Sequence, residues 1–536
     1  MSDTDRRLIT TFCIMLLLSG VVMVDLLKIS LRREFVEAAN TQSTYSVTVD
    51  TSRGRIYDHK MRSLAGGRLQ YRAVIEPSAE TTEHLFGVIE PGELSAISDG
   101  LKGRSPFVYV ARDASIAGPG VRVFRGEERY GENSVAEHIV GCVDGSGAGA
   151  SGAEYAFNEY LEECSGSLTA VYTVNSRGRS LSRAEPVIYD TSANSNGGVV
   201  LTLDYDIQRV AEEAADEFIE RGAIVVVEVP SGKIRACVSR PGFDRGDMAA
   251  SLERDDAPLI DRAITAYDVG SVFKLVVAAA ALDSGIEPEW TCECTGSVQI
   301  GSNVFHCSNR SGHGELDMSE AVAGSCNIYF IKLAQQLGGA RILEQAKRLG
   351  FGEKIMLADN FAAEAGRLPA LNSLENPAAL ANLAFGQGEL MATPMHVAQL
   401  AAAVANGGMM PETTVFESFV TPKGERFGQR APAQPQRVMS ENTADLLRQF
   451  MIKTVVSGTG KKGASEKTTS AAKTGTAQTG MVRDGHKVLQ AWYAGFFPAD
   501  EPKYVCVVLV EDGESGGASA GPVFARIADR LARFPG

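Results

Sequence analysis

Hydrophobic residues form one long uncharged run near the beginning of the chain. Residues 8–24 hold no charged side chain, and two leucines at 26–27 could extend the run past Asp25. Such a run lies at the short end of what spans a membrane. No small-x-small cleavage site follows closely, so an uncleaved anchor is favoured over a cleaved signal peptide. We predict a cytoplasmic tail at residues 1–7 and a transmembrane anchor at residues 8–27.

Farther along, alternating and β-branched runs predict strands, and helical spacing appears between them. Residues 45–50 alternate as a half-buried strand does, and the runs at 223–229 and 234–239 flank a Pro-Ser-Gly-Lys turn typical of a hairpin. Strands at both ends with helices between them indicate an α+β (α/β) fold whose sheet is built from distant parts of the chain. The other predicted elements are helices at 204–220 and 522–534 and strands at 489–496 and 504–511.

Composition sets limits on architecture and function. The chain has 536 residues, too many for one ordinary domain, and 44% of them are hydrophobic. A linker-like Asn-Ser-Asn-Gly-Gly segment divides a strand-rich module at 28–195 from a larger domain at 196–536. The net charge of -14 offers no dominant basic face, which argues against a nucleic-acid partner. Arg6 and Arg7 before the apolar run and Lys28 after it leave its orientation open.

Three short motifs, remote from one another in sequence, supply the groups needed for acyl transfer through a serine ester. They are Ser271-Val-Phe-Lys274, Ser325-Cys-Asn327 and Lys473-Thr-Gly475. Each is weak alone, because the S-x-x-K spacing recurs at Ser470 and the S-x-N spacing recurs at Ser192 and Ser440. The choice between these serines depends on their local context.

Context selects Ser271 as the nucleophile. An apolar run follows it and predicts a buried helix, whose first turn favours the negative charge that develops in acylation. Residues three apart lie one above the other on a helix, which places Lys274 against the Ser271 hydroxyl. Ser470 lies among threonines that predict a strand, where residues three apart point to opposite faces.

Each motif residue also has a plain structural interpretation. Ser271 could merely cap a core helix, Lys274 could reach solvent, and Lys473 could be a surface strand residue. Taken singly, these interpretations are the more common ones. The occurrence of all three motifs in this order, each in suitable predicted structure, favours the catalytic interpretation.

A lysine acts as a base only when it is neutral. Burial and a second nearby cation would both lower the pKa of Lys274, and Lys473 is the candidate for that cation. Ser325 could bridge the two amines and pass a proton to the leaving group.

The third motif is also predicted to form a strand at the sheet edge, to which a substrate peptide adds as a further strand. Gly475 leaves room for the peptide, and the hydroxyls of Thr474 and Thr476 can hold its terminal carboxylate. Asn327 can donate its side-chain amide to the substrate backbone. The N–H groups of Ser271 and Thr476 are the candidates for an oxyanion hole.

With these motifs in place, the chain resembles a class B penicillin-binding protein, a peptidoglycan D,D-transpeptidase of the penicillin-binding protein 2 or division type. The resemblance covers nearly the whole chain. Asp268-Val269 replaces the proline-rich pair usual before Gly-Ser, and Ala472 stands where glycine often precedes Lys-Thr-Gly, but neither change removes a reacting group. The other similar segments are residues 53–58, 152–154, 201–204 with Gln208, 258–263 with Tyr267, 385–389 with 393–394, and 492–498.

The resemblance implies a transmembrane helix, a strand-rich pedestal domain at 28–195, and a transpeptidase domain at 196–536 with a central antiparallel sheet flanked by helices, as in serine β-lactamases. It implies a single-pass protein of the cell membrane with its active site outside the cell. Ser271 would be acylated by a D-Ala-D-Ala stem peptide and would pass the acyl group to a neighbouring stem, in division or elongation. β-Lactams would acylate the same serine, no metal or organic cofactor is implied, and a membrane glycosyltransferase of the SEDS family is the expected partner.

Four of the nine cysteines fall in one short stretch, at Cys292, Cys294, Cys307 and Cys326. Unpaired buried thiols are the plainest interpretation. A disulfide comes second, because this domain would lie outside the reducing cytosol; Cys307 with Cys326 is the preferred pair and Cys294 with Cys307 the other. A zinc site that includes His306 or His313 comes last, since the ligand spacing fits no standard pattern, and we expect no metal.

Three other functions compete with the transpeptidase. A β-lactamase needs a deacylating base, and the chain has no Glu-x-x-Leu-Asn motif to supply it. A β-lactam sensor needs an inward signalling domain, whereas about seven residues precede the apolar run. A non-catalytic wall scaffold would not need Ser271, Lys274 and Lys473 intact.

Overall fold

The computed structural model describes residues 2–30, 43–131, 134–175, 179–181, 185–431, 433–483 and 485–534. The chain divides into two compact units. Unit 1 comprises Met1–Arg53, Gly67–Arg129 and Ser165–Ser195, and unit 2 comprises Gly54–Gly66, Tyr130–Cys164 and Asn196–Gly536. The last boundary coincides with the predicted one. The two inner segments of unit 2 depart from the prediction, which placed them in the N-terminal module.

Strand pairing and burial explain that departure. β2 (Arg55–Tyr57) pairs in parallel with β9 (Gly198–Leu201), which fixes the first inner segment to unit 2. Both strands belong to a five-stranded sheet of order β20-β19-β9-β2-β3. The second inner segment buries Ile139 and Leu161 in the largest hydrophobic core of unit 2. Long-range pairing of this kind leaves no local signal in a sequence.

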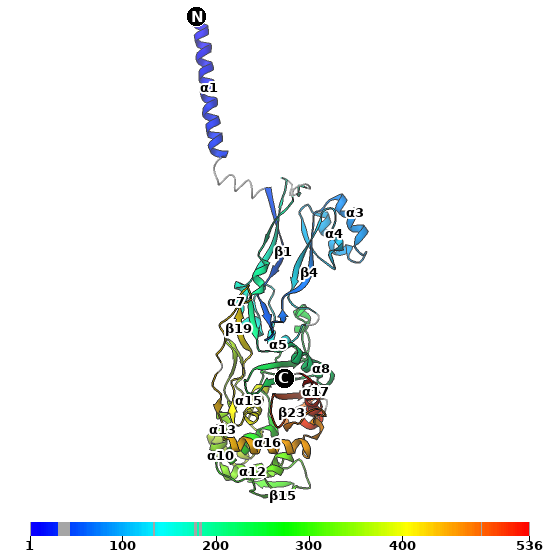
Figure 1. Cartoon of the computed structure of the whole chain (residues 1–536), viewed down its shortest axis with the longest axis vertical. Coiled ribbons are helices and arrows are strands. Elements are labelled where there is room, and N and C mark those ends of the chain that lie inside the picture. The colour runs from blue at the N-terminus through cyan, green and yellow to red at the C-terminus, as the bar shows by residue number, and fades with distance from the viewer. Residues whose placement is uncertain are drawn as a thin grey trace. The chain divides into compact units, whose positions relative to one another are not determined.

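Unit 1 begins with α1 (Asp3–Ser30), a helix long and apolar enough to cross a membrane (Figure 1). Its 28 residues correspond to about 42 Å of helix, which exceeds the thickness of a bilayer's hydrocarbon core, about 30 Å. The helix contains the predicted anchor at residues 8–27 and extends beyond it at both ends.

Two small antiparallel sheets form the rest of unit 1. β1 (Thr44–Ser52) confirms the predicted alternation, because Val47 and Val49 are buried. The first sheet has the order β1-β7-β8 and the second β5-β4-β6. The bounds are β4 Arg68–Ile75, β5 Phe107–Ala111, β6 Val121–Glu128, β7 Gly166–Thr173, β8 Val187–Asp190, α3 Ala79–Val88 and α4 Leu94–Lys102.

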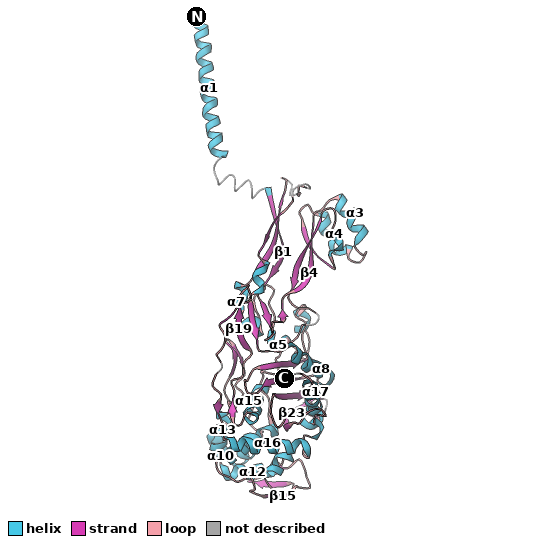
Figure 2. Cartoon of the chain, viewed as in Figure 1, coloured by secondary structure: helices cyan, strands magenta, loops and turns pink. Residues whose placement is uncertain are grey.

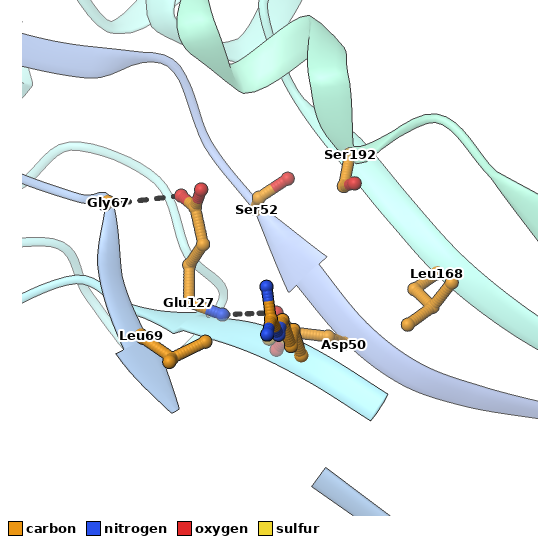
Figure 3. Close-up of a pocket in the computed structure, with 9 residues that line it drawn as sticks. Asp50, Ser52, Gly67, Leu69, Glu127, Leu168 and Ser192 are labelled. Carbon is orange, nitrogen blue, oxygen red and sulfur yellow. Dashed lines mark hydrogen bonds between the residues drawn. The ribbon is translucent and has the colours of Figure 1, made fainter. Parts of the chain in front are cut away.

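A pocket of about 240 Å³ in unit 1 is lined by residues of β1, β4, β6 and β7 (Figure 3). Asp50 accepts a hydrogen bond of 2.7 Å from the N–H of Glu127, and the Glu127 carboxylate accepts one of 3.1 Å from the N–H of Gly67. Arg72 pairs with Asp50 at 3.2 Å. These carboxylates therefore join strands of unit 1, and none of the predicted site residues lines the pocket.

The strand order of the central sheet of unit 2 confirms that distant parts of the chain build one antiparallel sheet. Figure 2 labels β23 among its strands, drawn in magenta. The order of the sheet is β11-β10-β24-β23-β22. The predicted hairpin forms β10 and β11, and β22, which carries the third motif, lies at the edge. The bounds are β10 Gly222–Glu228, β11 Ile234–Arg240, β22 Ala471–Arg483, β23 His486–Phe497 and β24 Tyr504–Glu511.

Both faces of this sheet are buried, as its unbroken β-branched runs require. Along β10, Ile224 and Val226 contribute to one core with α8 (Tyr205–Phe218) and α17 (Gly521–Leu531). Val225 and Val227 contribute to the larger core on the other face, with α10, α15 and α16. The bounds there are α10 Lys274–Asp283, α15 Pro394–Ala405 and α16 Glu441–Val456. The sheet therefore holds β22 rigidly between two helical layers.

Shorter elements complete unit 2. The helices are α5 Glu137–Val140, α6 Gly152–Ala156, α7 Asn158–Glu163, α9 Met248–Leu252, α11 Met318–Ala323, α12 Asn327–Leu337, α13 Gly339–Arg348 and α14 Pro377–Ala384. The strands are β3 Ser63–Ala65, β12 Cys292–Cys294, β13 Ser297–Ile300, β14 Asn303–His306, β15 Gly314–Leu316, β16 Ile355–Ala358, β17 Phe361–Ala363, β18 Met409–Met410, β19 Phe416–Val420, β20 Arg426–Phe427 and β21 Gln436–Arg437.

Candidate active site

Ser271 lies in a 3₁₀ turn, Gly270–Phe273, directly before α10. Side chains three apart eclipse one another in a 3₁₀ turn, so Ser271 and Lys274 leave the backbone on the same side. Lys274 to Ala281 are all buried, as the apolar run predicts, whereas Ser271 is partly exposed. The local structure therefore presents a reachable hydroxyl at the start of a buried helix.

Close backbone contacts hold this turn in place from two sides. The Gly270 N–H donates to the Gly386 carbonyl at 2.9 Å, and a Cβ on Gly386 would lie 1.9 Å from the Gly270 carbonyl oxygen. On the other side, a Cβ on Gly475 would lie 2.9 Å from Val272 Cγ2 and 3.0 Å from the Val269 carbonyl oxygen. The glycine at 475 thus permits close approach of β22 to the nucleophile turn.

The Lys274 amine is fully buried and turned toward the second motif. It donates to the Ser325 carbonyl at 2.7 Å, to the Ser325 hydroxyl at 3.2 Å and to Asn327 Oδ1 at 2.7 Å. Burial lowers the pKa of Lys274 to about 7, so the neutral amine is well populated near neutral pH. Within the described residues, the Ser271 hydroxyl has no hydrogen-bond partner and is free to meet an incoming group.

Lys473 approaches the same hydroxyl from β22. Its amine is fully buried and donates to Ser325 Oγ at 3.0 Å and to the Thr474 carbonyl at 2.7 Å. Burial and the charge of Lys274 lower the pKa of Lys473. The Ser325 hydroxyl therefore lies between two amines, as the sequence analysis expected.

The second motif adopts a constrained turn. Ser325 has a φ of 55°, in the left-handed region that costs free energy for a residue with a Cβ. Cys326 caps α12 and accepts a hydrogen bond of 3.4 Å from the N–H of Tyr329. Asn327 donates one amide N–H to the carbonyl of His306 at 3.0 Å, which leaves its second N–H for the predicted contact with substrate.

Two contacts at β22 involve residues that sequence reasoning did not identify. The Thr474 hydroxyl is 2.7 Å from the hydroxyl of Thr459, which follows α16. Thr476 is exposed, and its hydroxyl accepts a hydrogen bond of 3.2 Å from the N–H of Gly516. Neither partner belongs to a recognisable motif, although the Ser-Gly-Thr-Gly run around Thr459 is a turn signal. Ser470 is buried outside this cluster, immediately before β22.

Free, buried thiols, the plainest interpretation of the sequence, are what the described residues show, and the possible disulfide is not formed among them. The sulfur atoms of Cys307 and Cys326 lie 3.9 Å apart, and both cysteines are free thiols, as is Cys294 of the second predicted pair. A bonded pair would require sulfurs about 2 Å apart. The hydrogen bond from Tyr329 to Cys326 instead fixes this thiol as a helix cap.

These groups can carry out acyl transfer. A reachable hydroxyl starts a helix, one amine can accept its proton, and a second hydroxyl connects that amine to another. β22 is the edge strand of its sheet among the described residues, a position at which an extended peptide can add as a further strand.

Comparison with known proteins shows the family to which this chain belongs. Residues 222–529, more than half of the chain, match the penicillin binding protein transpeptidase domain. Peptidoglycan D,D-transpeptidase PbpA of Mycolicibacterium smegmatis is 30% identical over 353 residues, which cover 61% of this chain and 71% of that protein. Penicillin-binding protein PbpB of the same organism is 30% identical over 467 residues, covering 80% and 70%.

A solved structure gives the same result for the fold. A chain of a peptidoglycan synthase complex aligns with a TM-score of 0.70 and 25% identity, over 99% of this chain and 98% of that one. The family match includes α10, α12 and β22, at which the three motifs lie, and the neighbouring strands β10, β23 and β24. The chain therefore belongs to the family of penicillin-binding proteins with a transpeptidase domain.

Proposed function

We propose that this protein is a membrane-anchored peptidoglycan D,D-transpeptidase that cross-links stem peptides through an acyl-enzyme on Ser271. One observation carries the proposal: Lys274 and Lys473, both fully buried, meet at the hydroxyl of Ser325 beside the nucleophile turn. Two buried amines are costly to retain unless they have a chemical task.

The first half of the reaction forms the ester. Ser271 Oγ attacks the carbonyl carbon of the penultimate D-Ala, and its proton passes to the neutral Lys274 amine. The N–H groups of Ser271 and Thr476 stabilise the oxyanion. The C–N bond then breaks, and the leaving D-Ala nitrogen takes a proton from Lys274 through the Ser325 hydroxyl. An amine of a neighbouring stem reverses these steps, giving the new amide and free Ser271.

Substrate recognition follows from the edge position of β22. The stem peptide adds to this strand through backbone hydrogen bonds, and the hydroxyls of Thr474 and Thr476 hold its terminal carboxylate. Asn327 contributes its free amide N–H to the peptide backbone. β-Lactams, which present a strained amide and a carboxylate, acylate Ser271 by the same route and leave slowly.

The anchor and the chemistry together assign the location. Peptidoglycan lies outside the cell membrane, so we place the catalytic domain on the outer side of a single-pass α1. The similar chain of known structure belongs to a peptidoglycan synthase complex that coordinates polymerisation and crosslinking. By analogy, the partner is a membrane glycosyltransferase of the SEDS family, in division or elongation.

Labelling with a fluorescent penicillin, followed by mass spectrometry of the adduct, tests the proposal. Stable, stoichiometric labelling on Ser271 is expected, together with loss of labelling in Ser271→Ala and normal labelling in Ser470→Ala. The second variant is a matched control, because Ser470 begins the other S-x-x-K spacing. Rapid turnover of the label would instead indicate a β-lactamase, and a folded wild-type protein that never labels would indicate a non-catalytic scaffold.

A further inference from the structure

The short segment that leads into Ser271 is held in place residue by residue. Residues 267–269 form only an isolated bridge before the 3₁₀ turn, so no helix or long strand fixes their path. The N–H and the carbonyl of Tyr267 each bond to the backbone of Ala392 at 2.9 Å, and the Gly270 N–H is bonded as described above. These backbone contacts fix the two ends of the segment. Two side chains of the central sheet hold its middle and the tyrosine ring.

The first of these side chains is Trp492, which belongs to β23 and is fully buried. Its indole N–H donates a hydrogen bond of 2.9 Å to the carbonyl of Asp268, three residues before the nucleophile. Its ring lies 6.5 Å from the ring of Tyr267, centroid to centroid, at an interplanar angle of 75°. A buried indole N–H is a donor that needs an acceptor. The bond therefore sets how far the Asp268 carbonyl lies from β23.

The second side chain is Glu511, the last residue of β24. Its Oε1 accepts a hydrogen bond of 2.8 Å from the Tyr267 hydroxyl and another of 2.8 Å from Nε of Arg262. Both donors belong to buried residues. The other guanidinium nitrogens of Arg262 donate to the carbonyls of Asp256 and Ala257, at 3.2 Å and 3.1 Å. Glu511 therefore joins β24 to two points of the chain that leads to the nucleophile.

The strands that supply these two side chains also hold the third motif. Trp492 lies directly opposite Gly475 in the pairing of β22 with β23, and β24 pairs with β23 on its other side. One sheet therefore fixes both the Lys-Thr-Gly strand and the approach to Ser271. Apolar side chains of similar size could fill the same core. They would not set the direction of the Asp268 carbonyl or of the Tyr267 hydroxyl.

We infer that Trp492 and Glu511 are positioning residues for the nucleophile, an inference that rests on the proposed transpeptidase function. Neither belongs to the three motifs. By fixing the segment before the nucleophile, they set the place of the Ser271 N–H and hydroxyl relative to the N–H of Thr476, the other candidate donor of the oxyanion hole. A displacement of about 1 Å at such a point can slow a reaction by about a hundredfold.

Penicillin acylation of the full chain in detergent, measured over a range of drug concentrations, tests the inference. Such a series separates the non-covalent dissociation constant from the rate constant of acylation. Tyr267→Phe and Trp492→Phe each remove one donor and keep an aromatic ring in the core. Each should lower the acylation rate constant by roughly ten- to a hundredfold. The dissociation constant should stay nearly unchanged, because the substrate-binding groups of β22 are intact.

Two substitutions of Glu511 test that residue in graded steps. Glu511→Ala removes both acceptor oxygens, whereas Glu511→Gln keeps an oxygen that can accept from the Tyr267 hydroxyl. The glutamine variant should therefore recover most of the acylation rate that the alanine variant loses. Because Glu511→Ala leaves Arg262 buried without its anion, this variant could fail to fold. Tyr267→Phe, which leaves the ion pair intact, then carries the test.

Tyr57→Phe is the matched control for Tyr267→Phe. Tyr57 is also a buried tyrosine of unit 2, and its hydroxyl donates to the carbonyl of Asn196 at 2.7 Å. It belongs to β2, in a sheet that carries none of the three motifs. Loss of one such hydrogen bond should lower the melting temperature of both variants by a similar amount. Only Tyr267→Phe should lose acylation rate.

Three results would overturn the positioning role. One is an acylation rate constant equal to that of the wild type in both Tyr267→Phe and Trp492→Phe. Another is an equal loss of rate in Tyr267→Phe and Tyr57→Phe, which would mark a general defect of folding. The third is a loss that lies wholly in the non-covalent dissociation constant. Folded wild-type protein that never acylates would instead refute the proposed transpeptidase, so the two failures remain distinguishable.

Discussion

Lys473 donates a hydrogen bond of 3.0 Å to the hydroxyl of Ser325, although 148 residues separate the two in the chain. The same hydroxyl lies 3.2 Å from the amine of Lys274. A proton accepted by Lys274 therefore has a route through a hydroxyl whose lone pairs are oriented by a second amine. The arrangement explains why neither lysine reaches solvent.

Ser325→Ala should break this route. Proton transfer by a positioned group typically contributes a factor of about 10² to 10⁴ in rate, so we expect the acylation rate to fall by about that factor. Lys473→Ala should have a similar effect, because it removes the donor on the other side of the hydroxyl. Stopped-flow labelling with a fluorescent penicillin measures both rates.

Ser440→Ala provides the control for this pair. Ser440 shares the S-x-N spacing but caps α16, where its hydroxyl accepts from the N–H of Thr443 at 3.1 Å. The variant should lose about 1 kcal/mol of stability and keep its acylation rate. An equal loss of acylation in Ser440→Ala and Ser325→Ala would contradict the proposed relay.

The acylation rate should rise with pH through neutrality. Lys274 accepts a proton only when it is neutral, and burial lowers its pKa to about 7. The groups that face this amine are Lys473, Ser325, Asn327 and the thiols of Cys307 and Cys326. A base with this pKa is neutral in about a tenth of molecules at pH 6 and about nine tenths at pH 8, so the rate should rise roughly tenfold. A rate that is flat or falls over this range would exclude Lys274 as the base.

Gly475→Ala should separate β22 from the nucleophile turn. The new Cβ would lie 2.9 Å from Val272 Cγ2, closer than real Cβ contacts, and 3.0 Å from the Val269 carbonyl oxygen, tighter than most of them. Overpacking of this kind costs about 1–3 kcal/mol, and a displaced turn should also slow acylation. Thermal unfolding and penicillin labelling measure the two effects. Gly87→Ala is the control: a Cβ there meets nothing within 4 Å, and the residue lies in α3, so the variant should keep its acylation rate and lose no stability.

Thr459→Ala should weaken recognition of the substrate carboxylate. The Thr459 hydroxyl lies 2.7 Å from the Thr474 hydroxyl and orients it within β22. Loss of one such hydrogen bond is worth about 1 kcal/mol, so we expect a roughly fivefold fall in the second-order acylation rate. Thr459→Ser should restore the rate. Equal rates in the wild type and both variants would show that Thr474 needs no orientation.

Much of this architecture could be predicted from local patterns. The β-branched runs on either side of Pro230 predict a hairpin from local sequence alone. The alternation of β1 likewise predicts that Val47 and Val49 lie on a buried face. The choice of Ser271 over Ser470 followed from the helix and strand predicted around each serine. The structure places Ser271 in a 3₁₀ turn directly before α10 and Ser470 directly before β22. No local pattern predicts that Lys274, Ser325 and Lys473 lie together. That prediction rested on the acyl-transfer reaction that the three motifs can perform jointly.

Other features depend on contacts between remote backbones. Gly386 is needed because its Cα faces the carbonyl of Gly270, and nothing near it in sequence reveals that approach. The cysteines at 292–326 are conspicuous in the sequence, but which of them lie close together could not be predicted, because Cys294 and His313, like Cys307 and Cys326, are 19 residues apart. That interval becomes meaningful only after two hairpins fold back beside α12.

The pairing of Gly222 with Val510 limits when the newly made chain can become active. Nearly the entire polypeptide must be synthesised and, in the orientation proposed above, exported before its central strands find their neighbours, and such remote pairing is slow to form. Until then, the serine, its base and its relay remain parts of separate segments. With the proposed orientation, a partly exported chain can therefore neither crosslink the wall nor react with a β-lactam, and crosslinking begins only after the carboxyl-terminal strands have paired.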